Sequence, residues 1–280
     1  MTISMKRAAF LFTGTIAAGM YGSVSFAADV ETVTSLPAIS GPNGKLQGSA
    51  GWADINDLSS DGIFRGGAAF SFPVGDMFGI QADLAAVDAF GDSAVGGALH
   101  AFTRDPNSYL LGVYGGYVDA SSSNIWYVGP EAELYLGNIS IEAIGGFMDV
   151  SGSGSSSGSE AYVVADLALY ATDNFRLSIG ASSVAGFEAG RAGLEWFMAD
   201  TVNLPVSLTL DGQVGENGFT SVMAGLNLYF GGEDKSLIRR HREDDPPIHA
   251  LSIFAAFLGT APLIPQCPEG LFWDGDSCSD

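Results

Sequence analysis

The 280-residue chain is acidic, with a formal net charge of −21, and it combines 47% hydrophobic residues with only 15% charged ones. This balance disfavours nucleic acid as a partner, because binding to phosphates needs basic patches. Mean hydropathy is +0.24, yet no apolar run reaches the roughly 18 residues that a membrane-spanning helix needs. The apolar residues must therefore be spread over strands.

The N-terminus has the parts of an export signal. Lys6 and Arg7 precede an apolar stretch from Ala8 to Ala18, and Ser25-Phe26-Ala27 supplies the small residues that a signal peptidase reads. We therefore expect an exported mature chain. The predicted segments are a signal peptide at residues 1–28 and a periplasmic linker at residues 29–44.

The next part of the chain breaks into about twelve segments in which apolar and polar residues alternate, separated by turn signals rich in Gly, Asn, Asp and Pro. Each is about as long as a tilted strand needs to be to cross a bilayer, and ten strands is the alternative count. The expected strands are 45–55, 62–72, 77–89, 93–104, 109–119, 124–136, 139–149, 160–171, 175–184, 187–198, 206–214 and 218–230.

Aromatic residues gather at both ends of these segments and leave mainly Tyr114 in the middle. Two aromatic belts are typical of a bilayer, whereas a soluble sandwich would place its aromatics at strand centres. The pattern predicts an all-β fold, a closed antiparallel up-and-down transmembrane barrel with both ends on the periplasmic side. The belts are Phe70, Phe72, Phe78, Phe102, Tyr109, Tyr135, Tyr170, Phe175, Trp196, Phe197, Tyr229 and Phe230 at one end, and Trp52, Phe64, Phe90, Tyr117, Trp126, Tyr127, Phe147, Tyr162, Phe187 and Phe219 at the other.

The last expected strand, Gly218 to Phe230, alternates strictly and ends in two aromatics. Its Gly225, Leu228 and Phe230 resemble the insertion signal of Gram-negative outer-membrane barrels, although Met223 stands at a polar position and about fifty residues follow. Residues 45–230 thus resemble the porin-like outer-membrane β-barrel family. The resemblance implies an outer-membrane location, lipid around the barrel and recognition of this strand by the barrel-assembly machinery.

The side chains expected to point inward carry more acids than arginines. We interpret the interior as a narrow passive channel for small solutes or cations, with Glu131 and Glu133 setting the preference. The alternative is a non-conducting structural barrel closed by salt bridges. The predicted pore-lining residues are Arg65, Asp83, His100, Arg104, Glu131, Glu133, Glu142, Asp166, Arg176, Arg191, Glu195 and Asp211.

An outer-membrane lipid hydrolase is the enzymatic alternative, and it would need a histidine beside a Ser or Thr nucleophile, or beside a metal. The expected barrel contains one histidine, His100, which we interpret as a hydrogen-bonding group of the interior. No catalytic motif is present in the sequence. We therefore expect no enzyme, no cofactor and no metal, and leave the solute and the oligomeric state open.

Residues 231–280 are expected to form a periplasmic tail on which the barrel does not depend. Lys235 to Pro247 reads as a solvated, charged linker, and Ile248 to Ile264 as a helix that packs in the periplasm or at an interface. Cys267 and Cys278 are expected to form a disulfide in the oxidising compartment. The stretch from Cys267 to Phe272, with Cys278, resembles the last disulfide loop of peritrophin-type chitin-binding modules, which suggests peptidoglycan as a partner.

Overall fold

The structure is a computed structural model. It describes residues 36–55, 59–120, 123–152, 158–202, 204–231, 235–244, 246–251, 253, 272–273 and 278–279. The signal peptide, the first half of the linker and Cys267 lie outside these residues, so the predictions of cleavage and of a disulfide stay predictions. Within the same residues no helix is long and apolar enough to cross a membrane.

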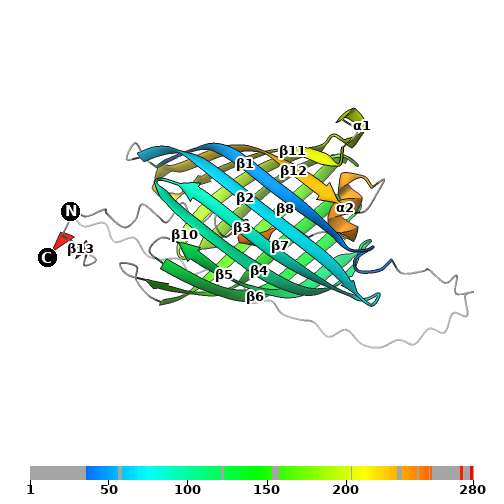
Figure 1. The fold of residues 1–280 in the computed structure, drawn as a ribbon, viewed down its shortest axis with the longest axis horizontal. Helices are drawn as coiled ribbons and strands as arrows, with labels where there is room; N and C mark the ends of the chain where they lie inside the picture. The colour runs from blue at the N-terminus through cyan, green and yellow to red at the C-terminus, as the bar shows by residue number, and fades with distance from the viewer. Residues whose placement is uncertain are drawn as a thin grey trace, which may run out of the picture. The chain divides into compact units, whose positions relative to one another are not determined.

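Among the described residues, twelve strands close into one antiparallel barrel in which neighbours in sequence are neighbours in space (Figure 1). The barrel strands are β1 (Asn43–Ile55), β2 (Ser59–Val74), β3 (Phe78–Ala89), β4 (Asp92–Asp105), β5 (Tyr109–Ala120), β6 (Ser123–Leu136), β7 (Ile139–Gly152), β8 (Gly158–Thr172), β9 (Phe175–Val184), β10 (Phe187–Phe197), β11 (Val206–Gly215) and β12 (Phe219–Phe230). The other numbered elements are the short helical segments α1 (Ala199–Val202), η1 (Glu216–Gly218) and α2 (Leu237–Glu243), and a two-stranded sheet of β13 (Phe272–Trp273) and β14 (Cys278–Ser279). Residues 249–251 and 253 are also helical.

Closure is made by β1 and β12, which pair from Gly44 with Phe230 to Ile55 with Phe219. A closed sheet leaves no unpaired edge, which is what a lipid environment requires of strands. The predicted fold class and the count of twelve strands are therefore confirmed, and the strand boundaries differ from the predicted ones by a few residues. We call the end around Asn43 and Phe230 the tail mouth, and the end around Ile55 and Phe219 the far mouth.

The alternation along β12 has the predicted sense. Ser221, Asn227 and Tyr229 are buried inside the barrel, while Val222 and Leu226 are half exposed on its outer face. Large apolar side chains are exposed on the other strands too, which gives the outer surface the character expected of a lipid-facing wall.

The aromatic belts are only partly as predicted. Six side chains at the tail mouth and four at the far mouth face outward. Nine others point into the barrel, because the alternation that sets the face outweighs position along the strand. The outward aromatics are Phe70, Phe72, Phe78, Tyr109, Trp196 and Phe230, with Trp52, Phe64, Trp126 and Phe147; the inward ones are Phe102, Tyr135, Tyr170, Phe197 and Tyr229, with Tyr127, Tyr162, Phe187 and Phe219.

The first part of the tail differs most from expectation. Instead of a solvated linker, the segment forms α2, which packs at the tail mouth (Figure 1). There Leu237 is fully buried against Tyr170, Phe197 and Tyr229. The chain then continues into the barrel, and Ile248 to Leu251 joins the apolar cluster of the interior together with Ile253.

Arg240 and Arg242 contact the wall, whereas Glu243 and Asp244 pair with Lys235, Arg239 and Ser40. The apolar residues that follow pack in the apolar interior.

The end of the linker also enters the tail mouth rather than remaining free. Ala38 donates its N–H to Asp76 O at 2.8 Å, and Ser40 donates its N–H to Glu243 O at 3.0 Å. Ile39 is buried in a small cluster with Phe102 and other inward side chains. Linker and tail therefore meet at one end of the barrel.

Candidate functional site

The interior of the barrel is the candidate site, and the structure places all the predicted pore-lining side chains there. Seven are buried, namely Asp83, His100, Arg104, Glu131, Glu133, Glu142 and Glu195. The others are partly exposed to a cavity of about 200 Å³, and these are Arg65, Asp166, Arg176, Arg191 and Asp211. Glu133, Glu142 and Glu195 also line the cavity, whereas Asp83, His100, Arg104 and Glu131 lie away from it.

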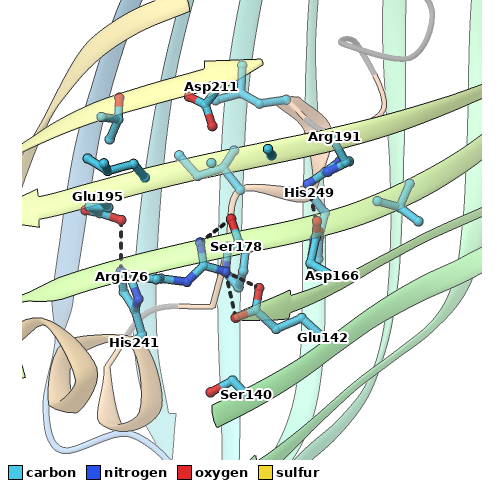
Figure 2. A pocket seen from close by; sticks show the side chains of 18 of the residues that line it. Ser140, Glu142, Asp166, Arg176, Ser178, Arg191, Glu195, Asp211, His241 and His249 are labelled. Carbon is cyan, nitrogen blue, oxygen red and sulfur yellow. Dashed lines mark hydrogen bonds and ion pairs between the residues drawn. The ribbon is translucent and has the colours of Figure 1, made fainter. Parts of the chain in front are cut away.

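Ion pairs cross the cavity wall from strand to strand. Arg176 on β9 donates from Nη2 to both carboxylate oxygens of Glu142 on β7, at 2.9 and 2.8 Å. Arg191 on β10 donates from Nη2 to Asp166 on β8 at 2.8 Å (Figure 2). Each pair joins next-nearest strands, since the two acids, Glu142 and Asp166, lie directly opposite each other on adjacent strands. Such half-buried pairs hold the wall in shape more than they add stability.

Glu195 on β10 binds both the wall and the tail. It accepts hydrogen bonds from Asn227 Nδ2 at 2.9 Å and from Tyr229 OH at 2.5 Å, both on β12. His241 Nε2 of α2 lies 3.5 Å from its second oxygen (Figure 2). A carboxylate that the sequence assigns to the pore is thus a docking point for α2.

Two arginines of α2 lie over inward aromatic rings. The Arg240 guanidinium is 5.1 Å from the ring centre of Phe197 and 5.4 Å from that of Tyr229. Arg242 lies 4.8 Å from Tyr135 and donates to Ile139 O at 2.9 Å. A cation over an aromatic face contributes about 0.5–2 kcal/mol, more when water is excluded. The inward aromatics of the tail mouth therefore bind the tail and do not form a lipid belt.

Arg104 on β4 joins the linker to the tail. Its Nε donates to Ala38 O at 2.7 Å, its Nη1 to His241 O at 3.2 Å and its Nη2 to Asp244 O at 3.1 Å. The planar fork of an arginine suits such convergent carbonyl acceptors. Arg104 is therefore a structural anchor of the tail mouth in this conformation, and its predicted place in a pore wall stays a prediction.

The chain after α2 is held by buried polar groups of β1 and β3. Lys45 donates from Nζ to Pro246 O at 3.2 Å. Gln81 Nε2 lies 3.4 Å from the same carbonyl and donates to Asp83 Oδ1 at 2.8 Å. Further in, Ile248 and Leu251 pack over Gly67, where an added Cβ would lie 2.8 Å from Leu251 Cδ1. The tail thus reaches about half the length of β2.

The far half of the interior is apolar. Phe187 and Phe219 pack edge to face with ring centres 5.7 Å apart, and both are almost fully buried. Tyr114 OH donates to Tyr162 OH at 2.5 Å, which satisfies one buried hydroxyl with another. These residues belong to one cluster with the apolar part of the tail. The barrel's own side chains therefore fill this half.

On the charged face of α2, the structure favours the ionised forms of both Arg239 and Glu243. Partial burial opposes the charge on Glu243, but hydrogen bonds from Arg239 at 2.8 Å and the nearby Lys235 ammonium at 3.1 Å outweigh it. The pKa of Glu243 is therefore lowered. Lys235 also donates to Asp244 at 2.7 Å, and Ser40 donates to the same carboxylate.

Sequence reasoning missed three groups of functional side chains: Lys45, the inward aromatics and the tail. Lys45 and Gln47 alternate with Leu46, a pattern that places Lys45 inside. The sequence also pairs an acidic set of inward residues with a basic, His-containing segment after the last strand, and this complementarity could have indicated contact between them. No local pattern signals that a segment after the last strand returns to the lumen.

No model of a protein family matches this sequence, and no curated protein matches it. Among solved structures, the KdgM porin in complex with disordered oligogalacturonate matches with a TM-score of 0.50 and 6% identity, over 66% of this chain and 98% of that chain. The Acinetobacter baumannii outer membrane protein Omp33 matches with a TM-score of 0.43 and 11% identity, over 66% and 97%. The Escherichia coli outer membrane phospholipase A matches with a TM-score of 0.42 and 13% identity, over 67% and 92%. The chain is a closed barrel with the fold of the outer-membrane porins.

Proposed function

We propose that the protein is an outer-membrane, porin-like passive channel for small solutes, with a preference for cations, whose passage is closed by its own tail in this conformation. The fold shared with a porin supports the class of protein. The predicted export signal supports the outer membrane, with the tail mouth toward the periplasm. The final strand would serve the barrel-assembly machinery, and peptidoglycan stays a candidate partner of the tail.

The observation that carries the proposal is the charged cavity of about 200 Å³ between the tail and the wall. A barrel built only for rigidity gains nothing from leaving ionised side chains around an unfilled space. His249 and Leu251 border this cavity, so removal of the tail would widen it. A displaced tail would thus turn a cavity into an open vestibule.

Cation preference rests on the sign of the charges that face the interior. The predicted set holds seven acids and four arginines, and Lys45 adds one further cation. Acids remain in excess, and a ring of one sign inside a low-dielectric wall admits counterions more easily. Glu133 borders the cavity and can act this way. Glu131 is turned to His249, so it would act only after the tail leaves.

The enzymatic alternative is weakened by the surroundings of His100. Its Nδ1 lies 2.8 Å from Glu131 and its Nε2 lies 3.2 Å from Asp83. Both ring nitrogens thus face carboxylates, and neither is offered to a hydroxyl nucleophile. We infer a barrel without hydrolase activity.

A non-conducting structural barrel is the second candidate, and the apolar far half favours it. Phe187 and Phe219 belong to the barrel wall and pack against each other near the far mouth. If these side chains form a permanent seal, removing the tail would open only a blind vestibule. The two candidates therefore differ in what tail removal does to conductance.

Conductance of the refolded protein in planar bilayers separates them. The full chain should be silent or open rarely, and a chain ending at Phe230 should conduct, with a reversal potential in a salt gradient that indicates cation preference. A chain ending at Ile253 is the matched control, because it keeps the contacts made by residues 235–253 and should stay closed. Silence of all three would favour the structural barrel, and anion preference would contradict the assigned charges.

A further inference from the structure

We propose that His100, Glu131 and His249 form a binding site for a divalent transition metal, zinc by its ligand chemistry, that fastens the tail inside the barrel. The three residues come from β4, β6 and the tail, and all are buried. The chain has three histidines, and two of them meet at this point. The site goes beyond the channel proposal and departs from the expectation of no metal.

The donor atoms converge closely enough for one ion. His100 Nδ1 lies 2.8 Å from Glu131 Oε2, and His249 Nε2 lies 3.4 Å from the same oxygen. All three ligand atoms lie within 4.8 Å of one another. Ligands about 2.0–2.1 Å from a tetrahedral zinc are about 3.3 Å apart, so modest side-chain rotations suffice.

A second carboxylate, that of Asp83, lies beside His100, where metal sites commonly have a hydrogen-bond acceptor for the ligand histidine. Asp83 Oδ2 lies 3.2 Å from His100 Nε2, the ring nitrogen that faces away from Glu131. Asp83 is itself held by Gln81 Nε2 at 2.8 Å. Metal-binding histidines commonly donate their other N–H to a carboxylate, which fixes the tautomer and aims the free lone pair at the metal. The orientation of His100 fits this arrangement.

The charge and the hydrogen bonding of this cluster also favour a bound cation. A neutral imidazole has one N–H, so His100 can satisfy Asp83 or Glu131 but not both. Glu131 Oε1 is buried and has no hydrogen-bond partner among the described residues. A bound cation would compensate Glu131 and would leave His100 to donate to Asp83. Two imidazoles and one carboxylate are a ligand set that suits zinc and cobalt better than magnesium or calcium, which prefer oxygen.

The ring contacts fix the position of the tail ligand. His249 packs 5.4 Å from the His100 ring centre and 5.5 Å from that of Tyr114. Lys45 and Gln81 hold the carbonyl of Pro246 just before it in the chain. His249 thus reaches the site only while the tail is inside the barrel. Metal binding and tail docking should therefore favour each other.

The test is cobalt binding to the refolded full chain, without a histidine tag and with equilibrium dialysis to count the metal. We expect one Co²⁺ per chain, the visible absorption of a tetrahedral site, and displacement by Zn²⁺. His249→Ala should weaken binding by at least about tenfold, in line with the loss of a supporting group at other metal sites. His241→Asn removes the remaining histidine, on α2; because His241 also helps to dock the tail, this variant should weaken binding clearly less than His249→Ala.

His249 lies in the tail and not in a barrel strand, so we expect its substitution to leave the barrel folded. Heat-modifiable gel mobility checks the folding of each variant. His100→Asn should abolish the same absorption. No stoichiometric binding by the wild type, or equal binding by His249→Ala, would overturn the site and leave a hydrogen-bonded cluster that holds only protons. Either result would leave the conductance of the truncated chain, and thus the channel proposal, untouched.

Discussion

The two halves of the barrel interior are filled in different ways. At the tail mouth the wall is polar and charged, and the filling is the tail, held by Arg240, Arg242 and the carbonyl contacts of Lys45. At the far mouth the wall is apolar, and the strands fill it with their own side chains, Phe187 and Phe219 among them. A polar filling can exchange its partners for water at low cost, whereas an apolar one loses its hydrophobic burial. We therefore expect the tail half to be the more mobile of the two.

The largest expected effect comes from the far half. Phe219→Ala removes an almost fully buried ring and should lower the free energy of unfolding by about 3–5 kcal/mol. Heat-modifiable gel mobility in detergent, measured against temperature, would report it. Phe64→Ala is the matched control, because that ring is 61% exposed on the outer face. Equal losses in the two variants would mean that the far half is not a packed core.

Overpacking the tail contact should come next. Gly67→Val would push a side chain against Leu251 and should destabilise the docked tail by about 1–3 kcal/mol while the barrel stays folded. Protease cleavage of the tail, followed by mass spectrometry, would detect its release. Gly66→Ala is the control, since an added Cβ there would lie 3.9 Å from Gln47 O, an ordinary contact. Unchanged protection in Gly67→Val would show that Leu251 does not dock there.

Removing the stacked guanidinium should loosen the tail by a smaller amount. Arg240→Ala loses the contacts with Phe197 and Tyr229, for which about 0.5–2 kcal/mol is typical. Faster hydrogen exchange in residues 237–251, with unchanged exchange in the strands, is the expected result. Arg239→Ala serves as control because its side chain is 55% exposed and pairs with Glu243 of the same helix. A similar effect of both variants would count against the stacking.

The smallest effect concerns pH. The pKa of Glu243 is lowered in the folded chain by Arg239 and Lys235, so its contribution to the folded tail segment around α2 is fully present above the ordinary glutamate pKa of about 4.3. It is lost as the pH falls through the lower pKa of the folded state. Protease protection of the tail should weaken below about pH 4 in the wild type. Glu243→Gln should show less of this dependence, and identical profiles would remove Glu243 as the cause.

The sequence predicted those features that depend on the residue pattern of a single strand. Strand alternation identified the fold and the inward side of every predicted pore residue, because a period of two leaves only two choices of face. The alternation could not predict that the tail also occupies the interior. Arg104 and Glu131 were assigned to an open pore although their partners, Asp244 and His249, lie more than a hundred residues away. Contacts of a returning segment have no local period, so composition alone does not predict them.

The central claim is that the tail occupies the half of the barrel near the tail mouth. Cross-linking tests it most directly, in a chain with Cys267→Ser and Cys278→Ser and a new pair, Gly67→Cys with Leu251→Cys. The account predicts a rapid disulfide on mild oxidation, seen as a shift in gel mobility, and none for Gly67→Cys with Lys235→Cys, whose tail position lies at the mouth. No cross-link between residues 67 and 251 in a folded barrel would contradict the account.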